Sequence, residues 1–156
     1  MKRILFVCTG NICRSPTAEA FFNDLVKQVG LQDQMAADSV GIANWHAGKP
    51  PDSRAIDALR NRGVDMSSLR ARVITSDDYW QNDYLLAMDH THMDFLQTHA
   101  GSDAGEIRMF LESLGRKDDV PDPFYGDKQD FEHALNLIED GCRAWFEKIR
   151  ATLPKS

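Results

Sequence analysis

The sequence predicts an α/β fold of three layers, with a four-stranded parallel sheet and helices on both faces. Short apolar runs of strand length alternate along the chain with segments whose apolar residues recur about every 3.6 positions. The run at 84–88 is almost continuously apolar, as in a strand buried on both faces. Such strand–helix–strand units form a parallel sheet with right-handed crossovers, and ligands bind beyond the carboxyl ends of its strands.

A single domain of residues 1–156 is expected, because no internal repeat, low-complexity segment or linker rich in Gly, Ser or Pro divides the chain. The formal net charge of −6 argues against non-specific binding to nucleic acid or to anionic membranes. No apolar run approaches membrane-spanning length, so no membrane insertion is expected. A monomer with at most weak self-association is expected.

The chain has three cysteines, Cys8, Cys13 and Cys142. An odd and sparse set, with no export signal at the N-terminus, predicts a reducing cytoplasm and thiol chemistry instead of a disulfide framework. No CxxC pair or HExxH spacing is present, so neither a metal site nor another cofactor is expected.

Apolar spacing, caps and chain breakers then assign the elements in order. A strand at 2–7 leads into a tight loop, after which Ser15 is expected to cap a helix that has Pro16 at its first position. The other expected boundaries and elements are the end of that helix at Gly30, a strand at 35–40 ended by Gly41, a loop at 42–52, a helix from 52 or 53 to 62, a short helix at 77–80 capped by Ser76, the strand at 84–88, a helix at 91–98, a last strand at 107–110, a loop at 115–126 and a long helix at 127–151.

The octapeptide Cys8-Thr9-Gly10-Asn11-Ile12-Cys13-Arg14-Ser15 joins the first strand to the first helix and has the form of a phosphate loop. Backbone N–H groups of a loop that opens a helix point inward together, and the helix dipole adds positive charge. Arg14 offers a planar fork for two oxygens of a tetrahedral anion. Cys8 is expected beneath that anion, in a field that lowers a thiol pKa and produces a nucleophilic thiolate, with Ser15 close enough to donate to it. Gly10 and Asn11 permit backbone angles that most residues avoid.

A proton donor is also expected, because a thiolate that attacks a phosphate ester expels an alkoxide or phenoxide. Asp122 lies in the segment Val120-Pro121-Asp122-Pro123-Phe124-Tyr125, where the two prolines restrict the local backbone. An Asp between prolines is commonly a turn residue. Its pairing with the octapeptide is what marks Asp122 as a candidate general acid.

The octapeptide and the downstream Asp122-Pro123-Phe124-Tyr125 together resemble the low-molecular-weight protein tyrosine phosphatases, and the similarity covers nearly the whole chain. It includes Asp38-Ser39, Trp45 with Gly48, Pro51-Asp52, Arg54-Ala55 and Met88-Asp89. The resemblance implies that Cys8 forms a phosphocysteine and that Asp122 protonates the leaving tyrosine oxygen and then activates water. It implies that phosphate is bound by the Arg14 side chain and by the loop amides of Thr9, Gly10, Asn11, Ile12, Cys13 and Arg14.

Further roles are implied by the same resemblance. The substrate would be a phosphotyrosine protein or another aryl phosphate, and the residues implied to line the slot for its ring are Trp45, Phe124 and Tyr125. The residues implied to support the loop are Ser15, Ser39 and Asp89. Reversible disulfide formation between Cys8 and Cys13 would protect the nucleophile from overoxidation.

The chain departs from the family pattern at two positions. Leu69 stands where the family usually has a histidine that supports the loop asparagine, so another donor, a water or a rearranged loop must brace Asn11. Phe124 keeps an aromatic ring but lacks the hydroxyl often found there. The five histidines are scattered and are expected to be exposed, without catalytic partners: His46, His90, His92, His99 and His133.

Three other functions use related chemistry. An arsenate reductase with a thiol relay needs further cysteines downstream of the loop, and none lies between Cys13 and Cys142. A cysteine phosphocarrier has no need for Arg14 with a proline-flanked acid. A silent phosphate-binding module predicts that Cys8 or Asp122 is lost, and both are present. Hydrolysis of aryl phosphates is therefore the favoured function.

Overall fold

The computed structural model describes residues 1–154. The strands are β1 (Lys2–Cys8), β2 (Met35–Gly41), β3 (Tyr84–Ala87) and β4 (Glu106–Met109). The helices are α1 (Arg14–Gln28), α2 (Ser53–Arg60), α3 (Ser76–Gln81), α4 (His90–His99) and α5 (Lys128–Arg150), with a 3-10 helix η1 (Phe110–Leu114) after β4.

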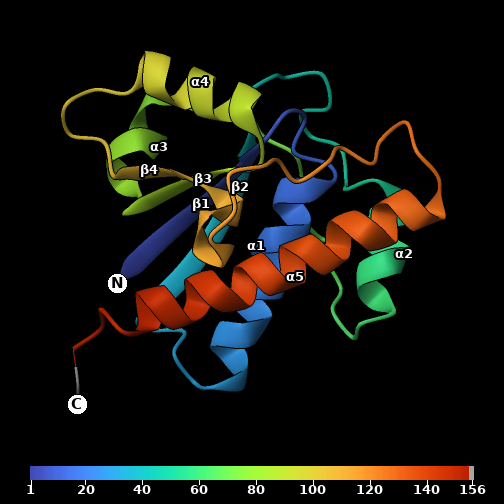
Figure 1. Ribbon diagram of the computed structural model, residues 1–156, viewed down its shortest axis with the longest axis horizontal. Helices are drawn as coiled ribbons and strands as arrows, with labels where there is room; N and C mark the ends of the chain where they lie inside the picture. Colours follow the sequence, from blue (N-terminus) through green and yellow to red (C-terminus); the bar gives the residue numbers. More distant parts are fainter. Residues whose placement is uncertain (155–156) are drawn as a thin grey trace.

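The four strands form one parallel sheet in the order β2-β1-β3-β4. Helices α1, α2 and α5 cover one face and α3 and α4 cover the other, so the predicted three-layer architecture is confirmed (Figure 1). Because side chains alternate along a strand, β1 contributes to both cores: Ile4 and Phe6 face α1 and α5, whereas Leu5 and Val7 face α3 and α4. All four of these side chains are fully buried.

The larger core is aromatic at its centre. Phe6 of β1 makes edge-to-face contacts with Phe22 of α1 and with Phe110 of η1, at centroid distances of 5.8 Å in both pairs. The apolar stripe of α5 closes this core, as its spacing predicts, and Trp145 donates from Nε1 to the carbonyl oxygen of Phe110 at 2.6 Å. This packing fixes α1, and therefore the loop that precedes it, against the sheet.

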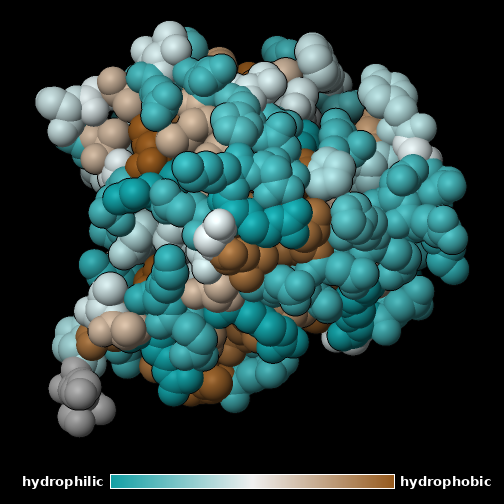
Figure 2. All heavy atoms as spheres, viewed as in Figure 1, coloured by the Kyte–Doolittle hydropathy of each residue, from teal (hydrophilic) through white to brown (hydrophobic). Residues whose placement is uncertain are grey.

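The parallel arrangement gathers three loops at one edge of the sheet. The segments after β1, after β2 and before α5 come together there, while the N-terminus and the C-terminal end of α5 lie toward the opposite side of the molecule (Figure 1). Hydrophilic residues dominate the face seen in Figure 2, with hydrophobic side chains showing between them. The edge at which the loops meet is where a ligand of a parallel α/β sheet is expected.

Two expected caps and one expected element differ from the structure. Ser15 does not cap α1, which begins at Arg14 after Cys13, because the Ser15 hydroxyl is engaged inside the loop. Thr75, not Ser76, caps α3, in a reciprocal capping box with Asp78. The last strand ends at Met109, and the chain turns into η1 at Phe110, whose ring is drawn into the core.

Candidate active site

The loop after β1 winds tightly because of local backbone geometry and close packing. Asn11 is the one non-glycine residue with positive φ, at 59°, among residues 1–154. Gly10 does not need such an angle; a Cβ there would instead lie 2.8 Å from Cδ2 of His46. A Cβ on Gly41 would lie 2.7 Å from the Thr9 carbonyl oxygen, so only glycine lets the end of β2 approach the loop this closely.

The Cys8 thiol lies at the base of this loop and is almost fully buried. Its Sγ lies 2.9 Å from the Ser15 hydroxyl oxygen. That hydroxyl also accepts from Asn11 Nδ2 at 2.8 Å and has the Val40 carbonyl oxygen as an acceptor at 3.3 Å, so rotation of its O–H bond lets its single hydrogen be donated either to Val40 or to a thiolate at Cys8. The expectation that Ser15 is near enough to stabilise the sulfur anion agrees with this geometry.

Arg14, the first residue of α1, has a buried guanidinium that the protein holds from one side. Nη1 donates to Asp89 Oδ2 at 2.8 Å and to the carbonyl oxygen of Val120 at 2.9 Å. Within residues 1–154 no protein acceptor takes the Nε–H, and Nη2 faces Asp122 Oδ2 at 3.5 Å. The edge formed by Nε–H and Nη2–H therefore remains available for two oxygens of a tetrahedral anion.

The Asp122 carboxylate reaches the same site from the loop before α5. Its side chain is about half exposed, at 45%, and its Oδ1 accepts from the Phe124 N–H at 3.1 Å. Arg54 holds this segment to α2, since its Nη2 donates to the Phe124 carbonyl oxygen at 2.9 Å and to Asp52 at 2.8 Å. The carboxyl group is thus held near Arg14 while remaining open to solvent.

A cavity of about 110 Å³ joins these groups. The residues that line it are Cys8, Thr9, Gly10, Ile12, Cys13, Arg14, Trp45, His46, Asp122, Phe124 and Tyr125. Trp45 is 70% exposed and Tyr125 is 94% exposed, so both lie at the mouth of the cavity. Phe124 is partly buried, and the centroid of its ring lies 5.9 Å from that of the His46 ring. An anion-binding base with aromatic walls suits a phosphate group attached to a flat ring.

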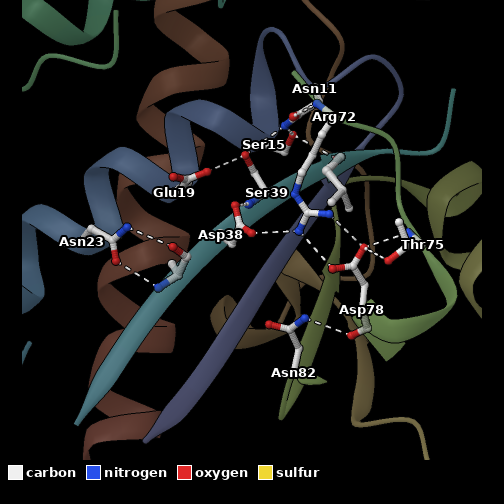
Figure 3. A network of polar contacts seen from close by, with 12 residues as sticks. Asn11, Ser15, Glu19, Asn23, Asp38, Ser39, Arg72, Thr75, Asp78 and Asn82 are labelled. Carbon is white, nitrogen blue, oxygen red and sulfur yellow. Dashed lines mark hydrogen bonds and ion pairs between the residues drawn. The ribbon is translucent and has the colours of Figure 1, made fainter. Parts of the chain in front are cut away.

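A hydrogen-bond network behind the loop braces Asn11 without a histidine (Figure 3). Asn11 Oδ1 accepts from the backbone N–H of Arg72 at 3.0 Å, and Nδ2 donates to Ser15 Oγ at 2.8 Å and to Ser39 Oγ at 2.9 Å. The Arg72 side chain is fixed in turn by Asp78 and Asp38. The Leu69 side chain cannot hydrogen-bond to Asn11, and the backbone N–H of Arg72 supplies a donor to Asn11 in its place.

Glu19 ends this network on the α1 side and should make stability depend on pH. Ser39 Oγ donates to Glu19 Oε1 at 2.7 Å, and burial raises the pKa of Glu19 from 4.5 to about 7. The folded state therefore binds more protons than the unfolded chain between these pH values, so this group makes stability fall as pH rises from 4.5 to about 7.

We expect Glu19→Gln to remove that fall in stability and to raise the free energy of unfolding at pH 8 by roughly 1–3 kcal/mol. Urea unfolding of both proteins at pH 4.5 and pH 8 measures this; an equal change at both pH values would contradict it.

Cys13 lies in the loop but its thiol is buried, and burial, followed by the nearby Asp52, raises its pKa. Burial likewise raises the pKa of Cys142, whose side chain is fully enclosed.

We expect iodoacetate at pH 7 to alkylate Cys8 in the native protein and to leave the Cys13 and Cys142 thiols unmodified. Peptide mass mapping reads this out, and modification of Cys13 at a rate similar to that of Cys8 would contradict it. All three cysteines are free thiols in the structure, and the Cys8–Cys13 disulfide stays a prediction.

Three features of the site differ from the sequence-based expectations. The brace on Asn11 comes from the Arg72 backbone, and His46 is half-buried and lines the cavity. His92 is fully buried, not exposed as expected, and its Nε2 lies 2.8 Å from the Thr9 hydroxyl. The only signal in the sequence was its place three residues after Asp89 at the start of a helix.

Trp45, Phe124 and Tyr125 line the cavity, as do the loop residues Cys8, Thr9, Gly10, Ile12, Cys13 and Arg14. Asn11 and Ser15, expected among the substrate-binding residues, do not line it, because their side chains bond to each other behind the loop. Ser39 contacts Asn11 and Asp89 contacts Arg14.

Residues 1–154 contain no group of three or more His, Cys, Asp or Glu side chains placed to hold a metal ion. Over the same residues, no helix has the length and apolar character needed to cross a membrane.

Comparison with known sequences gives one family. Residues 3–155 match the family described as "Low molecular weight phosphotyrosine protein phosphatase". A protein of Sus scrofa named "Low molecular weight phosphotyrosine protein phosphatase" is 39% identical over 154 residues, which cover 96% of this chain and 96% of that protein.

Solved structures give the same result. YfkJ from Bacillus subtilis superposes with a TM-score of 0.92 at 38% identity, covering 99% of this chain and 98% of that one. Wzb from Vibrio vulnificus, solved in complex with benzylphosphonate, gives a TM-score of 0.84 at 35% identity, covering 94% of this chain and 98% of that one.

Proposed function

The chain belongs to the low molecular weight phosphotyrosine protein phosphatase family, and we propose that it hydrolyses aryl phosphate monoesters, including phosphotyrosine in proteins, through a phosphocysteine on Cys8. One observation supports this above the others: Cys8, Arg14 and Asp122 meet at a single cavity although they come from segments far apart in the sequence. The aromatic walls of that cavity and the benzylphosphonate held by Wzb agree with an aryl phosphate.

In the first step the Cys8 thiolate attacks phosphorus, the S–P bond forms and the P–O bond to the tyrosine oxygen breaks. Arg14 and the loop amides hold the phosphoryl oxygens, on which negative charge is spread in the transition state. Asp122 in its acid form gives its proton to the departing oxygen, so that the product leaves as a neutral phenol. The Ser15 hydroxyl, 2.9 Å from Sγ, stabilises the thiolate before attack.

In the second step the Asp122 carboxylate takes a proton from a water molecule, and the water oxygen attacks phosphorus. The S–P bond breaks, its electron pair returns to sulfur, and inorganic phosphate leaves. Cys8 is again a thiolate and Asp122 is again an acid, so no cofactor or redox partner enters the cycle. The free thiols of this site suit a reducing compartment, and we propose that the protein works in the cytoplasm.

An arsenate reductase with a thiol relay fits the geometry less well. Cys142 would have to reach the loop, but it lies on α5 in the core, fully buried, with its Sγ 3.6 Å from the Ala18 carbonyl oxygen. Cys13 is the only other thiol and is protonated at neutral pH because burial raises its pKa. No observation therefore favours arsenate as the substrate.

Release of inorganic phosphate from a matched panel tests the proposed function. The panel consists of a phosphotyrosine peptide, the same peptide with phosphoserine, and phenyl phosphate. We expect the two aryl phosphates to be hydrolysed and the alkyl phosphate to be a poor substrate, because phenol is the better leaving group and its ring fits between Trp45 and Phe124. Equal rates for phosphotyrosine and phosphoserine, or no release from any aryl phosphate, would contradict the proposal.

A further inference from the structure

His92 is a fully buried ionisable group beside the site, and the steps above do not use it. It is the third residue of α4, the helix that follows β3. Its ring reaches the nucleophile loop on one side, where Nε2 lies 2.8 Å from Thr9 Oγ1. On the other side its Nδ1 lies 3.2 Å from the backbone nitrogen of Asp89.

The contacts of the ring bear on its tautomer. The Asp89 N–H donates to Nδ1, and Asp89 Oδ1 also lies 3.2 Å from that nitrogen; we assign Nδ1 as the acceptor because Asp89 Oδ1 already accepts from the His92 N–H. The ring proton is then on Nε2, which donates to the Thr9 hydroxyl oxygen. Burial, together with Arg14, lowers the pKa of His92 to about 4 despite the nearby carboxylates Asp89, Asp122 and Asp119, so the neutral ring is the form at neutral pH.

Asp89 links His92 to Arg14. Its Oδ2 accepts from Arg14 Nη1 at 2.8 Å, and its Oδ1 accepts from the backbone N–H of His92 at 3.2 Å. Asp89 and His92 thus hold each other in a reciprocal capping box at the start of α4. His92 therefore contacts Thr9, the neighbour of Cys8, through its ring, and its backbone N–H donates to Asp89, the carboxylate that orients the Arg14 guanidinium.

Resting on the proposed function, we propose that His92 is a positioning residue for phosphoryl transfer, which fixes Thr9 and Asp89 relative to each other and so sets the spacing of Cys8 and Arg14. Cys8 and Arg14 come from the two ends of the loop, and their partners must hold still while charge builds on the phosphoryl oxygens. Thr9 Oγ1 has no other hydrogen-bond partner within residues 1–154, so His92 alone ties this side chain in place.

Three variants separate the two hydrogen bonds of the His92 ring, which are to the Thr9 hydroxyl and to the Asp89 N–H. Thr9→Val removes the hydroxyl and keeps the shape of the side chain. His92→Asn keeps an acceptor near the position of Nδ1 and loses the reach to Thr9, whereas His92→Gln retains a donor near the position of Nε2. The matched controls are Thr98→Val and His99→Asn, because both residues are exposed on the same helix and bond only to α4 carbonyl oxygens.

We expect Thr9→Val and His92→Asn each to lower kcat for phenyl phosphate by roughly three- to tenfold, which is the effect of one lost hydrogen bond. The double variant should be no slower than either single one, because both remove the same bond. His92→Gln should recover most of kcat, and the two controls should match the wild type. Thermal unfolding of each protein gives the folded fraction to which kcat is referred.

A second readout does not depend on turnover: the concentration of inorganic phosphate that halves the rate at which iodoacetate alkylates Cys8. It should rise roughly three- to tenfold in Thr9→Val and His92→Asn. Additive effects on kcat, or wild-type kcat and phosphate protection with only a lowered unfolding temperature, would overturn the role of His92. A wild-type protein that releases no phosphate would instead overturn the proposed function, and the alkylation assay would still test His92.

Discussion

Replacing Cys8 with serine is expected to lower kcat for phenyl phosphate by at least about 10⁴-fold, the scale seen when an enzyme loses its covalent nucleophile. The site can hold an anion at Sγ, since the Ser15 hydroxyl lies 2.9 Å away and can turn its hydrogen from the Val40 carbonyl oxygen, at 3.3 Å, to a thiolate. A serine hydroxyl stays protonated in the same place, because among residues 1–154 the side chain at hydrogen-bond distance from this atom is the Ser15 hydroxyl, which is not a base. Steady-state phosphate release measures the effect.

Two controls accompany this variant. Cys142→Ser changes a cysteine in the core that has no part in the cavity, and we expect it to keep wild-type kcat per folded molecule. Cys8→Ser should still bind a phosphotyrosine peptide, because Arg14 and the loop amides remain, and calorimetry would detect that binding. Turnover of Cys8→Ser within tenfold of the wild type would remove Cys8 from the mechanism.

Replacing Asp122 with asparagine is expected to lower kcat by about 10²- to 10³-fold for phenyl phosphate, which needs its leaving oxygen protonated. With para-nitrophenyl phosphate the loss in the first step should be much smaller, because para-nitrophenolate leaves without a proton. Asp122 stands at the cavity with its side chain 45% exposed, close enough to Arg14 to face a bound phosphoryl group. Burst kinetics of aryl alcohol release, measured with both substrates, separate this first step from hydrolysis of the intermediate.

Asp118→Asn is the matched control for this prediction. Asp118 lies in the same segment before α5, but it pairs with Arg116 and does not line the cavity. We expect its burst rates to equal those of the wild type for both substrates. If Asp122→Asn slowed the burst equally with the two leaving groups, Asp122 would shape the loop instead of donating a proton.

Most of the architecture could be predicted from the sequence because local and global preferences agree. The apolar run at 84–88 becomes β3, one of the two inner strands, and the stripe on α5 packs on the core as its period requires. Where prediction failed, tertiary contacts decided the outcome. Ser15 has the residue type of a cap, but its hydroxyl is bonded to Cys8 and Asn11 inside the loop. Phe110 continues an apolar run, but its ring packs on Phe6 and the chain leaves the sheet there.

The site divides in the same way. Cys8, Arg14 and Asp122 could be singled out because the spacing of the first two and the prolines on either side of the third are visible in the sequence and indicate a phosphate loop and an acid. The brace on Asn11 could not, since a backbone N–H, that of Arg72, supplies it and every residue type except proline offers one. The burial of His92 could not be predicted, because nothing in the sequence shows that the turn after β3 brings its ring against Thr9. Contacts of this kind exist only once the sheet order is known.

The phosphocysteine on Cys8 is the central feature of the proposed mechanism, and a single turnover of the Asp122→Asn variant with para-nitrophenyl phosphate tests it directly. This substrate can phosphorylate the thiol without a proton donor, whereas the following hydrolysis lacks its base. After a denaturing quench, mass spectrometry should find one phosphoryl group on the peptide that contains Cys8, together with one equivalent of released nitrophenol. A phosphoryl group on any other residue, or nitrophenol and phosphate released together from an unmodified protein, would contradict the mechanism.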